Sequence, residues 1–130
     1  YELDIYQKFP KIWHAVVAPK VIIHLFKYNQ AEILEACRWH TTGKADMTIL
    51  EKIVFVADAL EPERNFKKVD DLRALVYEDL DLVVYLLTQL TVNTLRSKKL
   101  SISPDSLNCL KYYEKRNLKR NAKIISQFFS

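Results

Sequence analysis

The sequence predicts an all-α fold, on two grounds of composition and one of patterning. The 130 residues include one glycine and four prolines, so the chain has few of the residues that tight hairpin turns need. Long stretches are rich in Leu, Lys, Glu, Ala and Ile, which favour helix. Apolar residues recur at helical spacing, and their 49% share is enough for one buried core. We therefore expect a single bundle of helices.

The first forty residues predict two helices after an irregular start. Residues 1–12 are mixed and contain Pro10, which indicates a short helix or a loop. Residues 13–28 predict a buried helix that Pro19 breaks or kinks, with apolar positions at Val16, Val17, Ile22, Ile23, Leu25 and Phe26. Asn29 followed by Glu32 has the spacing of a capping box. It predicts a helix to about His40 that buries Ile33, Leu34 and Cys37, with Gly43 closing the next turn.

The remaining residues predict four further helices. Thr48 with Glu51 is a second capping box, and it opens a helix through Ile49, Ile53, Val54, Ala57 and Leu60 that Pro62 ends. After a polar loop at 63–68 we expect a short helix over 70–78 and a long one over 79–98. The long helix is apolar on most sides and should be central. A last helix from about residue 106 is amphipathic first and basic later, so we divide the chain into a helical domain, 1–110, and a basic helical tail, 111–130.

Positive charge is concentrated near the C-terminus. The net charge is +4, but residues 111–123 alone carry +5, which leaves −1 for the rest of the chain. The cations are Lys111, Lys115, Arg116, Lys119, Arg120 and Lys123, against Glu114. The basic character therefore belongs to the tail and says little about the helical domain.

Cysteine usage and hydropathy indicate a cytoplasmic protein without a membrane partner. No apolar run approaches the roughly 20 residues that span a bilayer. Cys37 and Cys109 form no CxxC motif, so we expect two reduced, buried thiols. The chain opens at Tyr1 without an initiator methionine, and we expect residues upstream of it.

Three side chains, His14, His40 and Asp58, indicate metal chemistry. Imidazole and carboxylate are the usual ligands of Zn, Fe and Mn. His40 is followed by Thr41, Thr42, Gly43 and Lys44, a pattern that suits a phosphate-binding nest. Asp58 lies in an apolar helix, where an unpaired carboxylate is costly. A divalent ion at this site would activate water for attack on a phosphate, so the pattern favours a metal-dependent phosphohydrolase.

Each candidate also has a purely structural interpretation. His24, between Ile23 and Leu25, is expected to be a core residue with one hydrogen bond. Asp58 is alternatively a helix-end carboxylate paired with Arg64 or a lysine. Ten residues from Thr48 to Asp58 make about 15 Å of helix. The link over 41–47 must therefore run back along the side to bring His40 to Asp58, and its seven residues can span roughly 23 Å.

The strings His40-Thr41-Thr42-Gly43 and Val56-Ala57-Asp58, the latter followed by Glu61-Pro62, closely resemble the YqeK family of HD-domain hydrolases. The resemblance covers roughly residues 1–113, and the stretch from His40 to Arg64 is its specific part. Supporting strings are Met47-Thr48-Ile49-Leu50-Glu51-Lys52, Val69-Asp70-Asp71-Leu72-Arg73, Glu78-Asp79-Leu80-Asp81 and Pro104-Asp105.

This resemblance implies an HD-type helical fold with a di-metal centre, commonly di-iron, with manganese or another divalent ion as the alternative. The implied reaction is symmetrical cleavage of diadenosine tetraphosphate into two ADP molecules by a metal-bound hydroxide. His14, His40 and Asp58 would be metal ligands, with Asp58 also catalytic. Thr41, Thr42, Gly43 and Lys44 would lie near the phosphates, and Glu61 and Arg64 would line the pocket.

The chain also departs from the family. Members usually have Gly-Pro after the first of these histidines, where this chain has Ala15-Val16. The earlier histidine and the His-Asp pair that names the fold have no counterpart. We therefore expect a fragment that is completed by a missing N-terminal portion of the same protein or by a fused domain. These 130 residues alone should bind metal weakly and have little activity.

Two other functions compete with hydrolysis. One is a non-catalytic HD remnant fused to a nucleotide-binding enzyme such as nicotinate-nucleotide adenylyltransferase. The other is nucleic-acid binding by Lys111–Lys123, with Tyr112 and Tyr113 stacking on bases, although such basic runs are usually only solvated helix faces. The apolar residues Ile124, Ile125, Phe128 and Phe129 should dock on the domain or a partner. Sequence leaves the metal's identity open, and a homodimer is compatible with it.

Overall fold

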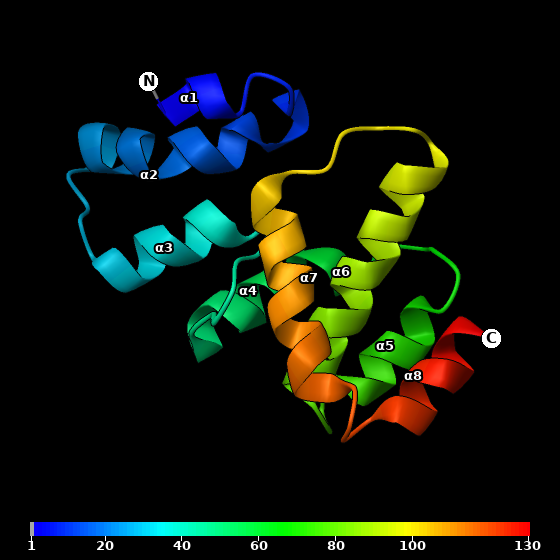
Figure 1. The fold of residues 1–130 in the computed structure, drawn as a ribbon. Coiled ribbons are helices and arrows are strands. Elements are labelled where there is room, and N and C mark those ends of the chain that lie inside the picture. The colour runs from blue at the N-terminus through cyan, green and yellow to red at the C-terminus, as the bar shows by residue number, and fades with distance from the viewer. Residues whose placement is uncertain (1) are drawn as a thin grey trace.

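A computed structural model describes residues 2–130, with side chains from residue 4 onward, and within this range the chain forms helices and no strand (Figure 1). The all-α prediction is thus confirmed. No helix within that range combines the length and apolar character needed to cross a membrane. The elements are α1 (Glu2–Ile5), the 3₁₀ turn η1 (Pro10–Ile12), α2 (Trp13–Phe26), α3 (Ala31–Trp39), α4 (Ile49–Leu60), α5 (Val69–Leu75), α6 (Leu80–Ser97), α7 (Pro104–Asn117) and α8 (Ala122–Phe129).

Helix α6 is the centre of the core, as its apolar sequence predicts. Its buried residues form an unbroken run from Leu82 to Thr88, followed by Val92. Helices α4 and α7 pack against it, and α5 contacts both α6 and α4 (Figure 1). Helix α8 lies beside α5 and inserts Phe128 into the same core, with the Lys68 ammonium 4.8 Å from that ring. A helix buried on most sides can therefore hold α4, α5 and α7 in place.

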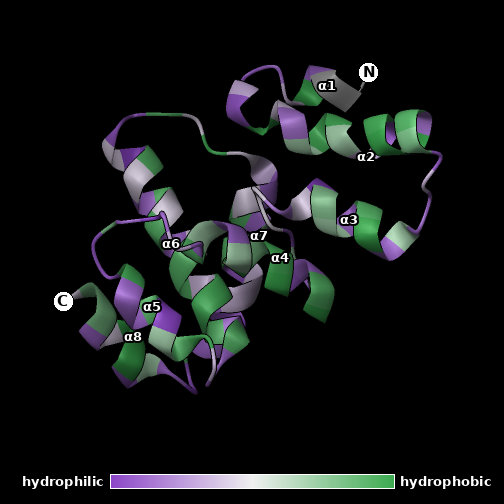
Figure 2. Ribbon diagram, turned by 180° about the vertical axis from the view of Figure 1, so that it is seen from behind, coloured by the Kyte–Doolittle hydropathy of each residue, from purple (hydrophilic) through white to green (hydrophobic). Residues whose placement is uncertain are grey.

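Helices α2 and α3 form an antiparallel pair set beside this core (Figure 1). The prediction of a buried helix over 13–28 is wrong in its exposure, because among the α2 residues only Ala15 and Val16 are buried. Leu25 and Phe26 are 65% and 73% exposed, and Figure 2 shows the apolar residues spread along this helix. His24, expected in the core, is exposed. Apolar residues alone do not bury a helix, and only the face of α2 that carries Ala15 and Val16 is covered. Pro19 lies inside α2 without ending it.

The ends of the two middle helices differ in how well their caps were predicted. The Asn29 cap is wrong: Gln30 is the N-cap of α3, and it makes no side-chain cap bond. Ile33 is 40% exposed and Cys37 is half-buried, so Leu34 and Ala36 are the buried residues of α3.

Helix α4 begins as predicted. The Glu51 amide donates to Thr48 Oγ1, and Glu51 Oε1 accepts from the Thr48 amide, both at 3.2 Å. This is the predicted capping box, and it satisfies two amide donors that a helix start leaves open. The buried residues of α4 are Glu51, Phe55 and Val56. Ile49 and Ile53 are 70% and 50% exposed, and Ala57 is exposed too.

The C-terminal region forms two helices where one was expected. Helix α7 starts at Pro104, two residues early, because Ser103 is its N-cap and accepts the Asp105 amide at 3.1 Å. It runs without interruption across residues 110 and 111 and buries Tyr113 and Asn117. The apolar end docks on the domain through Phe128, as expected. Both cysteines are free, and Cys109 is fully buried.

Candidate metal centre

Two of the three predicted metal ligands come together. His14 lies in the first turn of α2 and His40 is the C-cap of α3, so the antiparallel pairing of these helices places both at the same end. Their Nε2 atoms are 3.2 Å apart, and the rings meet edge to face with centroids 5.1 Å apart. Thr41 adds its Oγ1 at 3.1 Å from His14 Nε2. The α2–α3 hairpin thus brings together two histidines that are 26 residues apart in the sequence.

The tautomer of His40 follows from its backbone partner. Its Nδ1 lies 2.6 Å from the Cys37 carbonyl oxygen, which can only accept a hydrogen bond, so Nδ1 carries the proton. In the neutral ring Nε2 then holds a lone pair, and that lone pair faces His14. Metal-binding histidines are commonly oriented in this way, with one ring nitrogen bonded to a backbone carbonyl and the other free for the ion.

The spacing of the pair suits a shared cation. Two imidazole nitrogens bound to one ion at about 2.0–2.1 Å lie roughly 2.8–3.4 Å apart for ordinary bond angles. The observed 3.2 Å falls in this range. Imidazole nitrogens suit zinc, iron, copper and nickel, so the donor set is compatible with several divalent ions. The spacing and the donor types of His14 and His40 are therefore compatible with a shared divalent ion.

A network of four side chains holds His14 in position. The Trp13 indole donates to the Tyr6 carbonyl at 2.8 Å, which fixes the start of α2. The Tyr6 hydroxyl donates to Asp105 Oδ2 and accepts from Arg38 Nη2, both at 2.8 Å. Burial, and then the Asp105 carboxylate, raise the pKa of Tyr6, so its hydroxyl stays protonated. No local sequence pattern indicates this network, because its members are separated by up to 99 residues.

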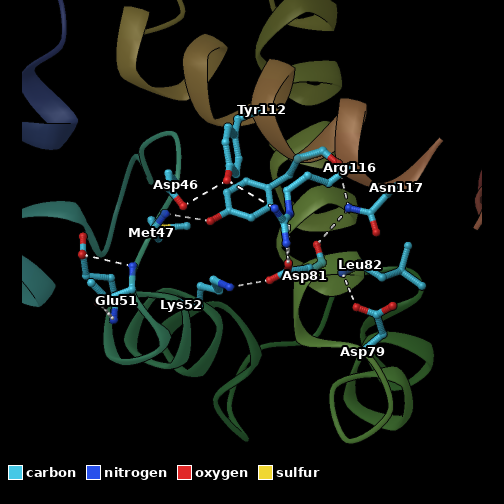
Figure 3. Close-up of polar contacts among 12 residues, drawn as sticks. Asp46, Met47, Glu51, Lys52, Asp79, Asp81, Leu82, Tyr112, Arg116 and Asn117 are labelled. Carbon is cyan, nitrogen blue, oxygen red and sulfur yellow. Dashed lines mark hydrogen bonds and ion pairs between the residues drawn. The ribbon is translucent and has the colours of Figure 1, made fainter. Parts of the chain in front are cut away.

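The loop after His40 is clamped onto α7. Gly43 adopts a φ of +68°, which side chains with a Cβ rarely tolerate, and a Cβ there would lie 2.6 Å from Cys109 Sγ. Ser106 Oγ donates to the Thr42 carbonyl at 3.3 Å. The Met47 amide donates to the Tyr113 hydroxyl at 2.8 Å (Figure 3). His40 is therefore tied through its own loop to a helix of the core.

Lys44 and Gly43, predicted to contact phosphate, already have partners inside the protein. The Gly43 amide donates to the Trp39 carbonyl at 2.9 Å. The Lys44 ammonium lies 3.1 Å from Oε2 of Glu51 and 3.5 Å from Oε2 of Glu35. Glu51 is 2% exposed, and its Oε2 has no hydrogen bond within the described residues, so the Lys44 charge is what compensates it. The capping-box pattern identified Glu51, but not this second role.

Asp58 does not join the histidine pair. It is exposed on α4, and among the residues that the structure describes no three His, Cys, Asp or Glu side chains are grouped closely enough to hold an ion. Its alternative pairing with Arg64 or a lysine is not found in the part of the chain that the structure describes, where Arg64 pairs with Glu61, with Nε and Oε1 3.5 Å apart. The assignment of Asp58 as a ligand and catalytic residue stays a prediction.

Glu61 and Arg64 lie in the turn that follows α4, and Arg73 fixes this turn. The Arg73 guanidinium donates to the carbonyls of Leu60, Glu61 and Arg64 at 3.2, 2.9 and 2.8 Å, and to Asp70 Oδ1 at 3.0 Å. Arg73 thus caps the C-terminal carbonyls of α4, which no helical amide can reach. It also borders a groove of about 830 Å³ between α4, α5 and the start of α6.

The structure corrects one aspect of the predicted nucleic-acid surface. Tyr113 is 1% exposed, and its hydroxyl is engaged by the Met47 amide, so this ring is not available to stack on bases. Tyr112 is half-buried and donates its hydroxyl to Asp46 Oδ1 at 3.0 Å (Figure 3). Successive residues of a helix point about 100° apart, and adjacent tyrosines therefore reach different surroundings.

Comparison with known proteins places this arrangement in context. The chain is 36% identical over 117 residues to the symmetrical bis(5'-nucleosyl)-tetraphosphatase of Staphylococcus aureus, a match that covers 87% of this chain and 60% of that protein. It is 36% identical over 97 residues to the protein of the same name from Bacillus subtilis, covering 75% of this chain and 52% of that protein. The chain thus spans about half of these relatives' length. No family model matches it.

A solved structure has the same fold. A Clostridium acetobutylicum protein, described as an HD superfamily hydrolase involved in NAD metabolism, superposes with a TM-score of 0.76 at 29% identity. The superposition covers 79% of this chain and 55% of that protein.

Proposed function

We propose that this chain, a relative of the symmetrical bis(5'-nucleosyl)-tetraphosphatases with the fold of an HD superfamily hydrolase, contributes the histidine pair of a divalent-metal phosphohydrolase site. The 3.2 Å approach of His14 Nε2 to His40 Nε2 carries this proposal. The substrate class is a dinucleoside polyphosphate, by analogy with the names of the relatives. The products would be two nucleoside diphosphates.

The residues of the chain have separate tasks in this scheme. A divalent ion, when bound, polarises a phosphoryl oxygen and makes a water more acidic. His40 presents a lone pair because its Nδ1 proton is held by Cys37, and His14 lies opposite it. The Thr41 hydroxyl, 3.1 Å from His14 Nε2, is placed to hydrogen bond a phosphate oxygen beside the pair. Further donors must complete the ion's shell, and Asp58 is our candidate for one of them.

Iron is our candidate for the resident ion, with manganese as the alternative, and neither preference comes from the geometry. Nitrogen and oxygen donors accept several divalent ions, so availability in the cell decides among them. To contact a phosphate, the Lys44 ammonium would have to turn away from Glu35. It would also move away from Glu51, because Glu51 is buried and cannot follow it. Glu61 and Arg64 would enter the pocket from the turn after α4.

The third histidine provides a matched control for the test. Metal affinity is measured by titration calorimetry with Mn²⁺ and Co²⁺ on the wild type and on His14→Ala, His40→Ala and His24→Ala. His24 is exposed on α2 and makes no contact with the pair. We expect weak binding that both pair variants abolish and that His24→Ala leaves unchanged. Equal affinity in all three variants would exclude the pair as the site.

Turnover is tested separately, by chromatography of the products formed from diadenosine tetraphosphate with added metal. We expect little activity from the 130 residues alone, because two histidines leave most coordination positions of an ion unfilled. Whatever product forms should be ADP, since unequal cleavage would give ATP and AMP. Robust turnover would show that these residues hold a complete site.

A non-catalytic HD module is the second candidate. It is favoured by one observation, that within the described residues only two of the predicted ligands converge. It predicts no metal-dependent turnover even when the chain is joined to the part of the Staphylococcus aureus relative that the match does not cover. The hydrolase proposal predicts that activity then appears and depends on His40.

A further inference from the structure

A cavity of about 470 Å³ lies on the flank of α7, where the loop of Lys44 and Ala45 passes over the helix. From α7 it is lined by Asn108, Lys111, Tyr112 and Lys115, with Asp105 at the helix start. Lys111, Tyr112 and Lys115 follow Asn108 by three, four and seven residues, so the four side chains lie along one face of the helix. The volume is in the range of sites that bind small molecules.

The two aspartates beside this cavity, Asp105 and Asp46, are already paired with other groups. Asp105 accepts the Tyr6 hydroxyl at 2.8 Å and lies 3.9 Å from Arg38. Asp46 accepts the Tyr112 hydroxyl at 3.0 Å. Glu114 forms no ion pair among the described residues and is not part of the cavity lining, but its charge adds to the effect of burial in raising the pKa of Tyr85.

Asp81 of α6, which pairs with Arg116 of α7, is likewise committed. Its Oδ1 accepts a hydrogen bond from Lys52 Nζ at 2.6 Å, and Arg116 Nη2 lies 3.2 Å from its Oδ2 (Figure 3).

Lys111 and Lys115 remain, and neither forms an ion pair with any residue in the range that the structure describes. Both side chains are exposed at the cavity. The cavity therefore carries two positive charges that the protein itself does not neutralise.

The neutral groups around these lysines can recognise more than a bare anion. Asn108 is exposed and its amide offers both donors and an acceptor. The half-buried ring of Tyr112 forms part of the wall, and its hydroxyl is held by Asp46, so the ring is fixed in orientation. Two cations, an amide and a fixed aromatic ring together match a phosphorylated ring compound.

We propose that this cavity is a binding site for a nucleoside di- or triphosphate, with the phosphates on Lys111 and Lys115 and the nucleoside against Tyr112 and Asn108. It lies on α7, whereas the histidine pair lies between α2 and α3. The cavity includes Lys44, but Lys111 and Lys115, its proposed phosphate ligands, have no role in the metal site or in the proposed hydrolase function. A small ligand is favoured over nucleic acid because the second tyrosine needed for a run of stacked bases is buried in the core.

The test measures binding to the full 130-residue chain by titration calorimetry, in chelator and without added metal. The probes are ADP, inorganic tripolyphosphate and adenosine. We expect ADP and tripolyphosphate to bind and adenosine to bind at least tenfold more weakly. Lys111→Gln/Lys115→Gln should weaken ADP binding at least tenfold. Lys11→Gln/Lys67→Gln removes the same charge from exposed lysines elsewhere and should change it less than twofold.

His40→Ala separates this proposal from the proposed function, because it should abolish metal binding and leave ADP affinity unchanged. Equal losses in the two lysine pairs would reduce the effect to net charge and overturn the site. Loss of ADP binding in His40→Ala would place the nucleotide at the histidine pair and overturn it too. So would a single-stranded RNA that binds through Lys111 and Lys115 and that ADP does not displace.

Discussion

Substitution of Gly43 by alanine tests the contact that fixes the loop after His40. A Cβ at this position would lie 2.6 Å from Cys109 Sγ, in a backbone conformation with φ of +68°. A left-handed conformation costs a residue with a Cβ about 1–2 kcal/mol. Overpacking a well-filled core costs about 1–3 kcal/mol more, and the stiffer unfolded chain returns about 0.4–1 kcal/mol. We expect Gly43→Ala to lower the free energy of unfolding by about 2–4 kcal/mol.

The assay is urea unfolding followed by far-ultraviolet circular dichroism on Gly43→Ala, Cys109→Ala and the double variant. Removal of Sγ alone should cost about 1–2 kcal/mol for the cavity it leaves. In the double variant the new methyl group occupies the space of the missing sulfur. The loss of unfolding free energy in the double variant should therefore be smaller than the sum of the two single losses by about 1–3 kcal/mol. Additive effects, with a coupling below about 0.5 kcal/mol, would refute the steric explanation.

Three further predictions concern pH, a helix cap and a polar network. Burial raises the pKa of the Cys109 thiol from 9.0 to about 11, although hydrogen bonds with Thr88 and with the Lys44 amide act to lower it. The folded state therefore holds this proton more tightly than the unfolded state, and its contribution, present below pH 9, is lost between pH 9 and about 11. Denaturation across this pH range should show a fall in the free energy of unfolding on the order of 2–3 kcal/mol, and Cys109→Ala should reduce this fall. If the pH dependence of the unfolding free energy is the same in Cys109→Ala, the thiol is excluded as its cause. Arg73→Ala should cost about 1–3 kcal/mol through the freed carbonyls of the turn after α4, and Arg73→Lys should recover little of it because an ammonium cannot reproduce the planar fork; full recovery would mean that charge alone matters. In double-mutant cycles of the unfolding free energy, the coupling of Lys52→Met with Asp81→Asn should be larger than the coupling of Arg116→Ala with Asp81→Asn. The reason is that Lys52 is 16% exposed and Arg116 is 53% exposed, so solvent screens the Arg116 pair more. The reverse order of couplings would contradict this ranking.

The helices were predictable where local signals and tertiary packing agree. The capping box of Thr48 and Glu51 marked the start of α4, and an apolar surface on most sides identified α6 as central. The error at Asn29 is a shift of one residue, of the kind that helix ends commonly show. The exposed α2 was misjudged for a different reason. An apolar pattern shows which residues would gain from burial, but it does not show whether a second element covers them.

The candidate site was predictable in its residue types and not in its geometry. The motif around His40 identified the ring, but the proton on its Nδ1 depends on the position of the Cys37 carbonyl, which only the end of α3 fixes. The meeting of His14 with His40 depends on the antiparallel pairing of α2 with α3. Lys44 had the right charge for a phosphate ligand. Its commitment to Glu51 appears only once the start of α4 and the loop are placed together.

The two halves of the histidine pair differ in how firmly the protein holds them. His40 is followed by a loop that contacts Ser106, Cys109 and Tyr113, so its position depends on a helix of the central core. His14 belongs to a helix with two buried residues, and its start is held by the hydrogen bond from Trp13 to the Tyr6 carbonyl. An ion shared by the two rings would therefore join a lightly packed helix to the core. Its binding free energy would be spent partly on ordering α2, which is a physical reason to expect weak affinity from these residues alone.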